Sequence, residues 1–250
     1  MKYTFVTSTN LKYWDEIAEF NLNSWNQHLP PDVDVLVFSE DKINHHLGSR
    51  FQFFDLYAES PELVAFSQKY QNNSHVNNQT TRTKSYKFKG VKFAHKTFAI
   101  FSAVNYIDDG WLIWLDNDVF MHETITHPYL MDILPKEKSI VYLGRPSMYS
   151  ECGFVGYNLD NSETKKFLKD FENVYLSGEI EQLRETHDSF IFDHVRLQKD
   201  QKLFHDLNNK SETNKPPFPL TRLKETMVHT KGLNKEKLQQ KILNKIKRRK

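Results

Sequence analysis

The sequence predicts a single α/β domain in which a mixed, mostly parallel central sheet is flanked by helices. Strand-like and helical segments alternate over residues 3–56, which is typical of a parallel α/β sheet. A nearly continuous apolar run, WLIWL at 111–115, has the pattern of a strand that is buried on both faces. The length of 250 residues, with 38% hydrophobic and 14% aromatic residues, suits one mid-sized domain with a sizeable core.

The first elements follow from the local patterns of the chain. Residues 3–10 are rich in β-formers and end in small polar side chains, so they predict an opening strand. Residues 11–25 place apolar side chains three and four positions apart, which predicts a helix. Short apolar stretches at 34–39 and 51–56 predict two further strands. The polar stretch 71–83, dense in Asn, Gln and Thr, predicts a mobile loop.

The middle and late elements follow in the same way. Residues 82–96 contain six Lys or Arg and no acid, and they lead into an apolar helix predicted over 93–106. The buried strand 111–115 comes next. The remaining elements are strands over 139–143 and 153–158, helices over 162–176 and 185–197, and a Pro-containing connection over 208–219.

Charge is distributed unevenly along the chain. Residues 235–250 contain eight Lys or Arg and one acid, so this segment carries a charge of +7. Because the whole chain has a net charge of +2, residues 1–234 carry −5. We therefore expect a domain over 1–234 and a basic tail over 235–250, whose Leu238, Ile242 and Ile246 form one narrow apolar stripe if the tail is helical. Such a tail can dock on an anionic membrane surface or a polyanion, or it can be a solvated helix end. The acidic body does not predict specific nucleic-acid recognition.

The sequence also bears on the compartment. No signal-peptide pattern precedes the first strand, and no apolar run approaches the length of a membrane span. The lone Cys152 excludes an internal disulfide. We therefore expect a cytoplasmic protein, with a peripheral position on the inner membrane surface where the tail docks there.

The sharpest chemical feature is the pair Asp116 and Asp118, which directly follows the strand 111–115. Open α/β sheets bind ligands outside the carboxyl ends of their strands, and residues i and i+2 of an extended chain point the same way. Two such carboxylates, together with phosphate oxygens, suit Mg²⁺ or Mn²⁺. An Asp-Asn-Asp sequence is also a common turn, so the structural alternative stays open.

Two other acidic motifs fit less well. An EF-hand loop would need an oxygen ligand, a Gly and a Glu where the sequence has Phe120, Met121 and His127. A haloacid-dehalogenase-type phosphatase also places Asp-x-Asp after a strand, but near the N-terminus and with a small residue at the position of Phe120. The remaining interpretation is the Asp-x-Asp motif of nucleotide-sugar enzymes.

At this point the sequence resembles glycosyltransferases of the GT-A fold, in particular small cytoplasmic and phage-encoded members. The matching segments occur in the family's order over nearly the whole chain up to Gly232: YTFVTST, VKFAHKTFAI, WLIWLDNDV, ECGFVGYN, THDSFIFD and VHTKG. The resemblance implies a single-domain, Rossmann-like GT-A fold.

The resemblance also implies roles for single residues. Asp116, Asp118 and His229 would hold a divalent cation, and Asp188 would be the catalytic carboxylate. Gly153 would lie against the sugar of the donor or acceptor. The residues implied in donor binding are Thr7, Lys96, Asn117, Lys231 and Gly232.

Each of these roles has a structural alternative. His229 could be an ordinary surface or core histidine, and Asp188 an N-cap or a helix charge. Gly153 also suits a bulge, and Thr7 a turn at the end of a strand.

The implied activity is that of a hexosyltransferase that depends on Mn²⁺ or Mg²⁺. Its partners would be a nucleotide-diphosphate sugar, in similar proteins most often a UDP-sugar, and a hydroxyl acceptor of glycan, lipid-linked or other type. Two alternatives remain: an Asp-x-Asp phosphatase or phosphotransferase, and a non-enzymatic binding module that acts through its basic tail.

Overall fold

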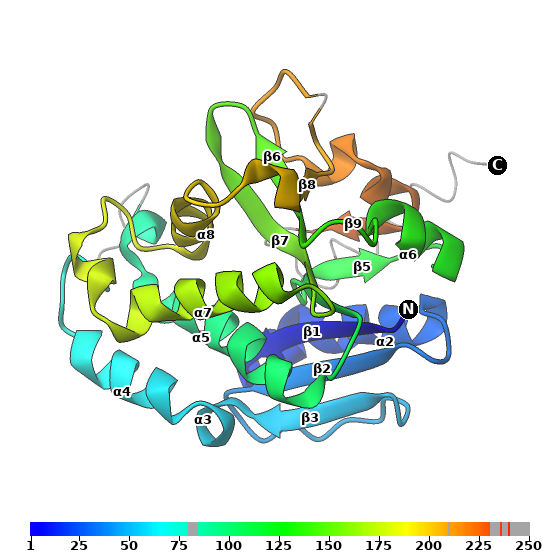
Figure 1. The fold of residues 1–250 in the computed structure, drawn as a ribbon. Coiled ribbons are helices and arrows are strands. Elements are labelled where there is room, and N and C mark those ends of the chain that lie inside the picture. The colour runs from blue at the N-terminus through cyan, green and yellow to red at the C-terminus, as the bar shows by residue number, and fades with distance from the viewer. Residues whose placement is uncertain (80–84, 210, 231–235, 237–239, 241–250) are drawn as a thin grey trace.

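The computed structural model describes residues 1–79, 85–209 and 211–230, together with Glu236 and Gln240. Its centre is a seven-stranded sheet with the strand order β3-β2-β1-β4-β7-β6-β8 (Figure 1). The strands of this sheet are β1 (Tyr3–Thr9), β2 (Asp34–Ser39), β3 (Phe51–Asp55), β4 (Trp111–Leu115), β6 (Ile140–Arg145), β7 (Met148–Asn158) and β8 (Phe204–Asp206).

The sheet is mixed and mostly parallel, as the sequence predicts. β1 pairs in parallel with β2 and β4, β2 with β3, and β6 with β8, whereas β7 runs antiparallel to β4 and β6. The carboxyl ends of β1, β2 and β4 therefore meet at one edge. A separate antiparallel pair, β5 (Val119–Met121) with β9 (Met227–His229), lies just beyond the end of β4.

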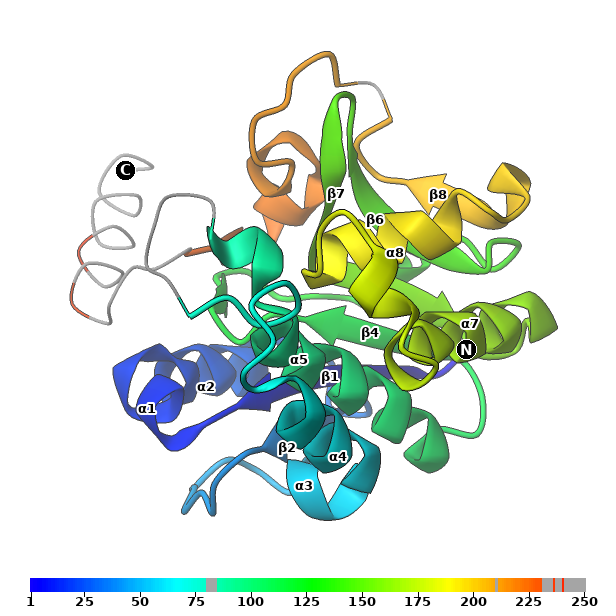
Figure 2. The ribbon, with the colours of Figure 1, turned by 90° about the vertical axis from the view of Figure 1, so that its left-hand side faces the viewer.

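Helices cover both faces of the sheet (Figures 1 and 2). The helices packed on one face are α3 (Leu56–Glu59), α4 (Pro61–Tyr70), α5 (Gly90–Ala103), α7 (Ser162–Leu176) and α8 (Asp188–Arg196). Those on the other face are a π-helical segment (Trp14–Ala18), α2 (Glu19–His28) and α6 (His127–Ile133). The short α1 (Leu11–Tyr13), which buries no side chain, leads into the π-helical segment. Short 3-10 turns span Ser85–Phe88, Val104–Tyr106, Glu179–Gln182, Gln201–Leu203, Phe218–Leu220 and Arg222–Glu225.

The two cores follow from the alternation of side chains along the strands. In β4, Leu112 and Trp114 pack toward α5 and α7, whereas Trp111, Ile113 and Leu115 pack toward α2 and α6. All five side chains are buried, because helices cover both faces of this strand. The apolar run that predicts the strand thus reflects the two cores.

Several elements differ in extent from the prediction. The strand predicted from Gly153 begins at Met148, and the helix predicted from Phe93 begins at Gly90. The helix predicted over 185–197 begins at Asp188, because the Thr186 backbone N–H donates to the Lys87 carbonyl and keeps the preceding residues extended. Six of the described helices and strands are not predicted from the sequence pattern: α3, α4, α6, β5, β8 and β9.

Some predictions fall outside the described residues. These are Lys231, Gly232, most of the basic tail 235–250, and residues 80–83 of the loop predicted over 71–83. In the part of the chain that the structure describes, no helix is both long and apolar enough to cross a membrane.

Candidate metal and donor site

A cleft of about 1520 Å³ opens at the carboxyl ends of β1 and β4. Ser8 and Asp116 line it from these two strand ends, Lys96 from α5, Gly153 from β7 and Asp188 from the start of α8. Parallel α/β sheets bind their ligands at this edge, so the position of the cleft agrees with the prediction from sequence.

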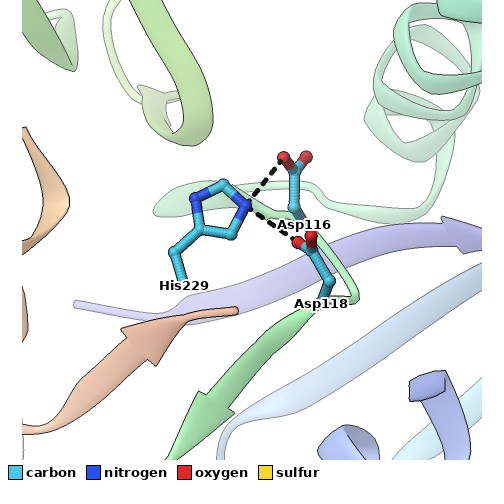
Figure 3. Close-up of side chains that lie close together, drawn as sticks. All are labelled: Asp116, Asp118 and His229. Carbon is cyan, nitrogen blue, oxygen red and sulfur yellow. Dashed lines mark ion pairs between the residues drawn. The ribbon is translucent and has the colours of Figure 1, made fainter. Parts of the chain in front are cut away.

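Asp116, Asp118 and His229 come together at the base of this cleft (Figure 3). One ligand atom from each lies within 4.8 Å of the others. The Nε2 atom of His229 lies 2.9 Å from Oδ1 of Asp118 and 3.8 Å from Oδ2 of Asp116. The structure thus brings together the three residues that the sequence analysis assigns to a metal.

The β5–β9 pair brings His229 to the two aspartates. The chain turns after β4 with a hydrogen bond from the Val119 N–H to the Asp116 carbonyl, and Val119 then pairs with His229. Both the backbone N–H and the hydroxyl of Thr230 donate to the Asp118 carbonyl. The histidine is therefore fixed by backbone pairing between segments that are far apart in the sequence.

Glu151, which the sequence analysis missed, orients the imidazole from the other side. Its Oε1 atom lies 3.0 Å from Nδ1 of His229, and both side chains are buried. A carboxylate on one imidazole nitrogen fixes the ring so that the other nitrogen faces the metal position. No local pattern marks Glu151, because the strand predicted from sequence begins only at Gly153, whereas β7 begins at Met148 and includes Glu151.

Neighbouring charges shift the pKa values of two groups in this cluster. Burial lowers the pKa of His229, but its contacts with Asp118 and Glu151 outweigh burial and raise the pKa to about 9. Burial raises the pKa of Asp116, but Lys96 and His229 outweigh it and hold the pKa of this carboxyl below its usual range. His229 is therefore protonated at neutral pH, and binding a metal through Nε2 would release that proton.

The ligand atoms of Asp116, Asp118 and His229 fit a hard divalent cation. Two carboxylates and one imidazole are ligands that Mn²⁺ and Mg²⁺ accept, and the remaining positions stay open for phosphate oxygens or water. Gly153 adds to this fit, because a Cβ atom there would lie 2.9 Å from Cε1 of His229 and 3.3 Å from Oδ2 of Asp116. Only glycine leaves this face of the cluster unobstructed.

Lys96 links the metal carboxylates to α8. Its ammonium lies 2.8 Å from Oδ1 of Asp116 and 3.1 Å from Oδ2 of Asp188, and it also donates to the Cys152 carbonyl. Trp114 adds a ring face 5.1 Å from the ammonium and donates its indole N–H to Asp116. Burial lowers the pKa of Lys96, but the two aspartates outweigh burial and raise it, so this lysine stays charged.

Two other residues that the sequence predicts to bind the nucleotide-sugar donor have different surroundings. Asn117 lines the cleft, and its side chain donates to the Ser8 carbonyl at 2.7 Å, which ties the end of β4 to the end of β1. Thr7 is fully buried within β1, and the neighbouring Ser8 and Thr9 line the cleft in its place. Thr7 points to the same face of β1 as Thr9 but lies further from the carboxyl end of the strand, where the cleft opens.

No protein-family model matches this chain, and a search of curated protein sequences finds no match. Among solved structures, the apo form of mouse xyloside xylosyltransferase 1 is similar, with a TM-score of 0.53 and 12% identity over 83% of this chain and 86% of that protein. The glycosyltransferase GlyE of Streptococcus pneumoniae aligns with a TM-score of 0.48 and 16% identity over 84% of this chain and 46% of GlyE.

At such identities the similarity concerns the fold. The mixed seven-stranded sheet, with the acidic cluster at the end of β4, agrees with it. This chain is similar in fold to glycosyltransferases of the GT-A type.

Proposed function

We propose that this chain is a metal-dependent glycosyltransferase that moves a hexose or related sugar from a UDP-sugar to a hydroxyl acceptor. The observation that carries the proposal is the convergence of Asp116, Asp118 and His229 at the base of a large cleft, at the strand ends where α/β sheets bind ligands. The similarity in fold to glycosyltransferases supports the same reaction class.

In this proposal Asp116, Asp118 and His229 hold Mn²⁺ or Mg²⁺. The bound cation would supply positive charge for the diphosphate of the donor, which gains negative charge as its bond to the sugar breaks. Lys96 supplies a second, permanent positive charge from α5, 2.8 Å from Asp116. Ser8, Thr9 and Asn117 at the strand ends would contact the nucleoside.

In the same proposal Asp188 acts on the sugar side of the cleft. It is the first residue of α8, it lines the cleft, and its side chain is 8% exposed. During transfer, a bond forms between the acceptor oxygen and the anomeric carbon, and the bond from that carbon to the diphosphate breaks. Asp188 would accept the proton of the acceptor hydroxyl or orient the donor sugar through its own hydrogen bonds.

We call the proposed metal site of Asp116, Asp118 and His229 the metal cluster. Its role can be tested through UDP binding. We expect Asp116→Ala and Asp118→Ala each to weaken Mn²⁺-dependent UDP binding by at least ~10-fold, about 1.4 kcal/mol, because each removes one charged ligand. Asp109→Asn is the matched control, since Asp109 is an exposed acid near the opposite end of β4. Isothermal titration calorimetry with and without Mn²⁺ measures the effect.

Calorimetry together with a hydrolysis assay separates the proposal from its rivals. Unchanged Mn²⁺-linked UDP affinity in both aspartate variants would refute the metal assignment. Hydrolysis of simple phosphate esters without hydrolysis of UDP-sugars would favour a phosphatase. Absence of affinity for nucleotide and metal in the native chain would favour a binding module.

A further inference from the structure

The cleft continues well beyond the metal cluster, toward the tip of the β6–β7 hairpin. This tip projects beyond the sheet beside α8 (Figures 1 and 2). We call this part of the cleft the hairpin end and define it by five of its lining residues: Arg145, Tyr149, Arg184, Phe190 and His194. The metal cluster leaves this end of the cleft free for a second substrate.

Tyr149 forms a fixed aromatic surface in the hairpin end. Its hydroxyl donates to Oε1 of Glu185 at 2.8 Å, and Glu185, itself 5% exposed, also contacts Lys87 at 2.7 Å and His187 at 3.1 Å. The Tyr149 ring packs edge-on against Phe190, with ring centroids 5.2 Å apart. Because buried Glu185 holds its hydroxyl and half-buried Phe190 packs against its ring, Tyr149 is preorganised for contact with a ligand.

Two arginines flank Tyr149. Nη2 of Arg184 donates to the Tyr149 hydroxyl at 2.7 Å, and Nε of Arg145 donates to the Tyr149 carbonyl at 2.6 Å. The guanidinium of Arg184 also lies over the Phe190 ring, 5.7 Å from its centroid. Both guanidinium groups are thus held by Tyr149, that of Arg184 at the phenol hydroxyl and that of Arg145 at the backbone carbonyl.

Neither arginine forms an ion pair within the described part of the chain. By contrast, Arg196, on the same side of the cleft, lies 2.7 Å from Asp193, and Arg222, outside the cleft, contacts Asp132 and Glu225. A guanidinium carries five N–H donors, so most donors of Arg145 and Arg184 remain for a ligand. Guanidinium groups bind phosphate and carboxylate strongly, through paired charge-assisted hydrogen bonds.

We propose that the acceptor is an acidic carbohydrate, whose sugar ring lies against Tyr149 and Phe190 and whose phosphate or carboxylate is bound by Arg145 and Arg184. This inference rests on the proposed glycosyltransferase function. Asp188 and Phe190 both belong to the first turn of α8 and both line the cleft, so an acceptor that extends from the hairpin end toward the metal cluster presents a hydroxyl to Asp188. The arginines then select acidic sugars over neutral ones.

Direct binding tests the inference without requiring transfer. The native chain is saturated with diamagnetic Mg²⁺ and UDP, so that the donor position is occupied, and is then titrated with glucose, glucuronate or glucose 6-phosphate under NMR observation. We expect at least one of the two acids to bind ~10-fold or more tightly than glucose, since a charge-assisted contact adds at least that factor. The acid that binds more tightly shows whether the acidic group of the acceptor is a carboxylate or a phosphate.

The variants assign this preference to the two arginines. Arg145→Gln and Arg184→Gln should each reduce the preference for the acid several-fold, whereas Arg222→Gln, which changes an arginine outside the cleft, should keep it. Equal affinity for glucose and both acids in the native chain would overturn the inference, as would an equal loss in the Arg222→Gln control. Failure of Mn²⁺ and UDP to bind would instead refute the proposed function.

Discussion

Lys96 connects Asp116 and Asp188 across the cleft. Its ammonium contacts both carboxylates, and it also donates to the Cys152 carbonyl. Asp188 is positioned by the start of α8, and its ion pair with Lys96 links it electrostatically to Asp116 of the candidate metal site.

The role of Asp188 can be separated from this structural contact. Asp188→Asn keeps the shape of the side chain and removes its charge, so transfer should fall by ~10²-fold or more if the carboxylate takes a proton or orients the sugar. Mn²⁺-dependent UDP affinity should change much less, because Lys96 retains Asp116. Steady-state transfer rates and calorimetry on the same preparation measure both quantities.

Asp170→Asn is a suitable control, since Asp170 lies in α7 and pairs with Lys199 away from the cleft. Near-normal transfer by Asp188→Asn would leave Asp188 as an ordinary charge at the start of a helix.

At the scale of elements, β7 serves both the metal cluster and the core. It carries Gly153 beside His229 and Gly156 three residues later, where a Cβ atom would lie 2.6 Å from Cδ2 of Leu134 and 3.2 Å from the Trp111 ring. The same substitution at these two glycines therefore tests two different functions of one strand.

We expect Gly153→Ala to displace the His229 ring and weaken Mn²⁺ binding by ~10-fold or more, with a small change in the free energy of unfolding. Gly156→Ala overpacks the core instead, so it should lower the free energy of unfolding by about 1–3 kcal/mol and leave Mn²⁺ affinity unchanged. Urea denaturation and Mn²⁺ titration of both variants provide the measurements. Equal effects of the two variants on Mn²⁺ affinity would contradict this division.

The elements that sequence predicts well are those whose pattern is local. The strand Trp111–Leu115 and the helix Ser162–Leu176 have the predicted bounds, because continuous burial and amphipathic spacing are visible in the chain itself. β5 and β9 are three residues each and exist as strands through pairing with one another, so no local pattern marks them.

The same limit applies to the candidate site. Asp116 and Asp118 are recognisable beside their strand, and the resemblance supplied His229 through its segment VHTKG. Glu151 is not recognisable, because its contact with His229 depends on β7 lying antiparallel to β4, which is a property of the whole sheet. Tyr149 is likewise identified by its contacts with Glu185 and Arg184.

At the scale of the whole molecule, charge separates the domain from its tail. Residues 1–234 carry −5 and residues 235–250 carry +7. Deleting 235–250 should weaken binding to vesicles that contain anionic lipid, with the largest difference at low salt, because each basic residue contributes up to ~1 kcal/mol near such a surface. UDP affinity should be retained, because the metal cluster and Lys96 precede the deletion.

Co-sedimentation of both forms with vesicles at low and high salt measures the difference. Equal pelleting of the two forms would identify the tail as a solvated end. Loss of UDP binding on deletion would show that the tail contributes to the cleft.

The pairing of β5 with β9 also has a consequence for how the protein is made. Every strand of the central sheet precedes Asp206, whereas His229 lies in β9, the last strand of the described chain. Because a ribosome delivers residues in order, a nascent chain has all seven sheet strands before it has the imidazole ligand. A product of interrupted translation that stops between these points keeps both aspartates but lacks the histidine. The candidate metal site is thus completed late, after the scaffold that carries it.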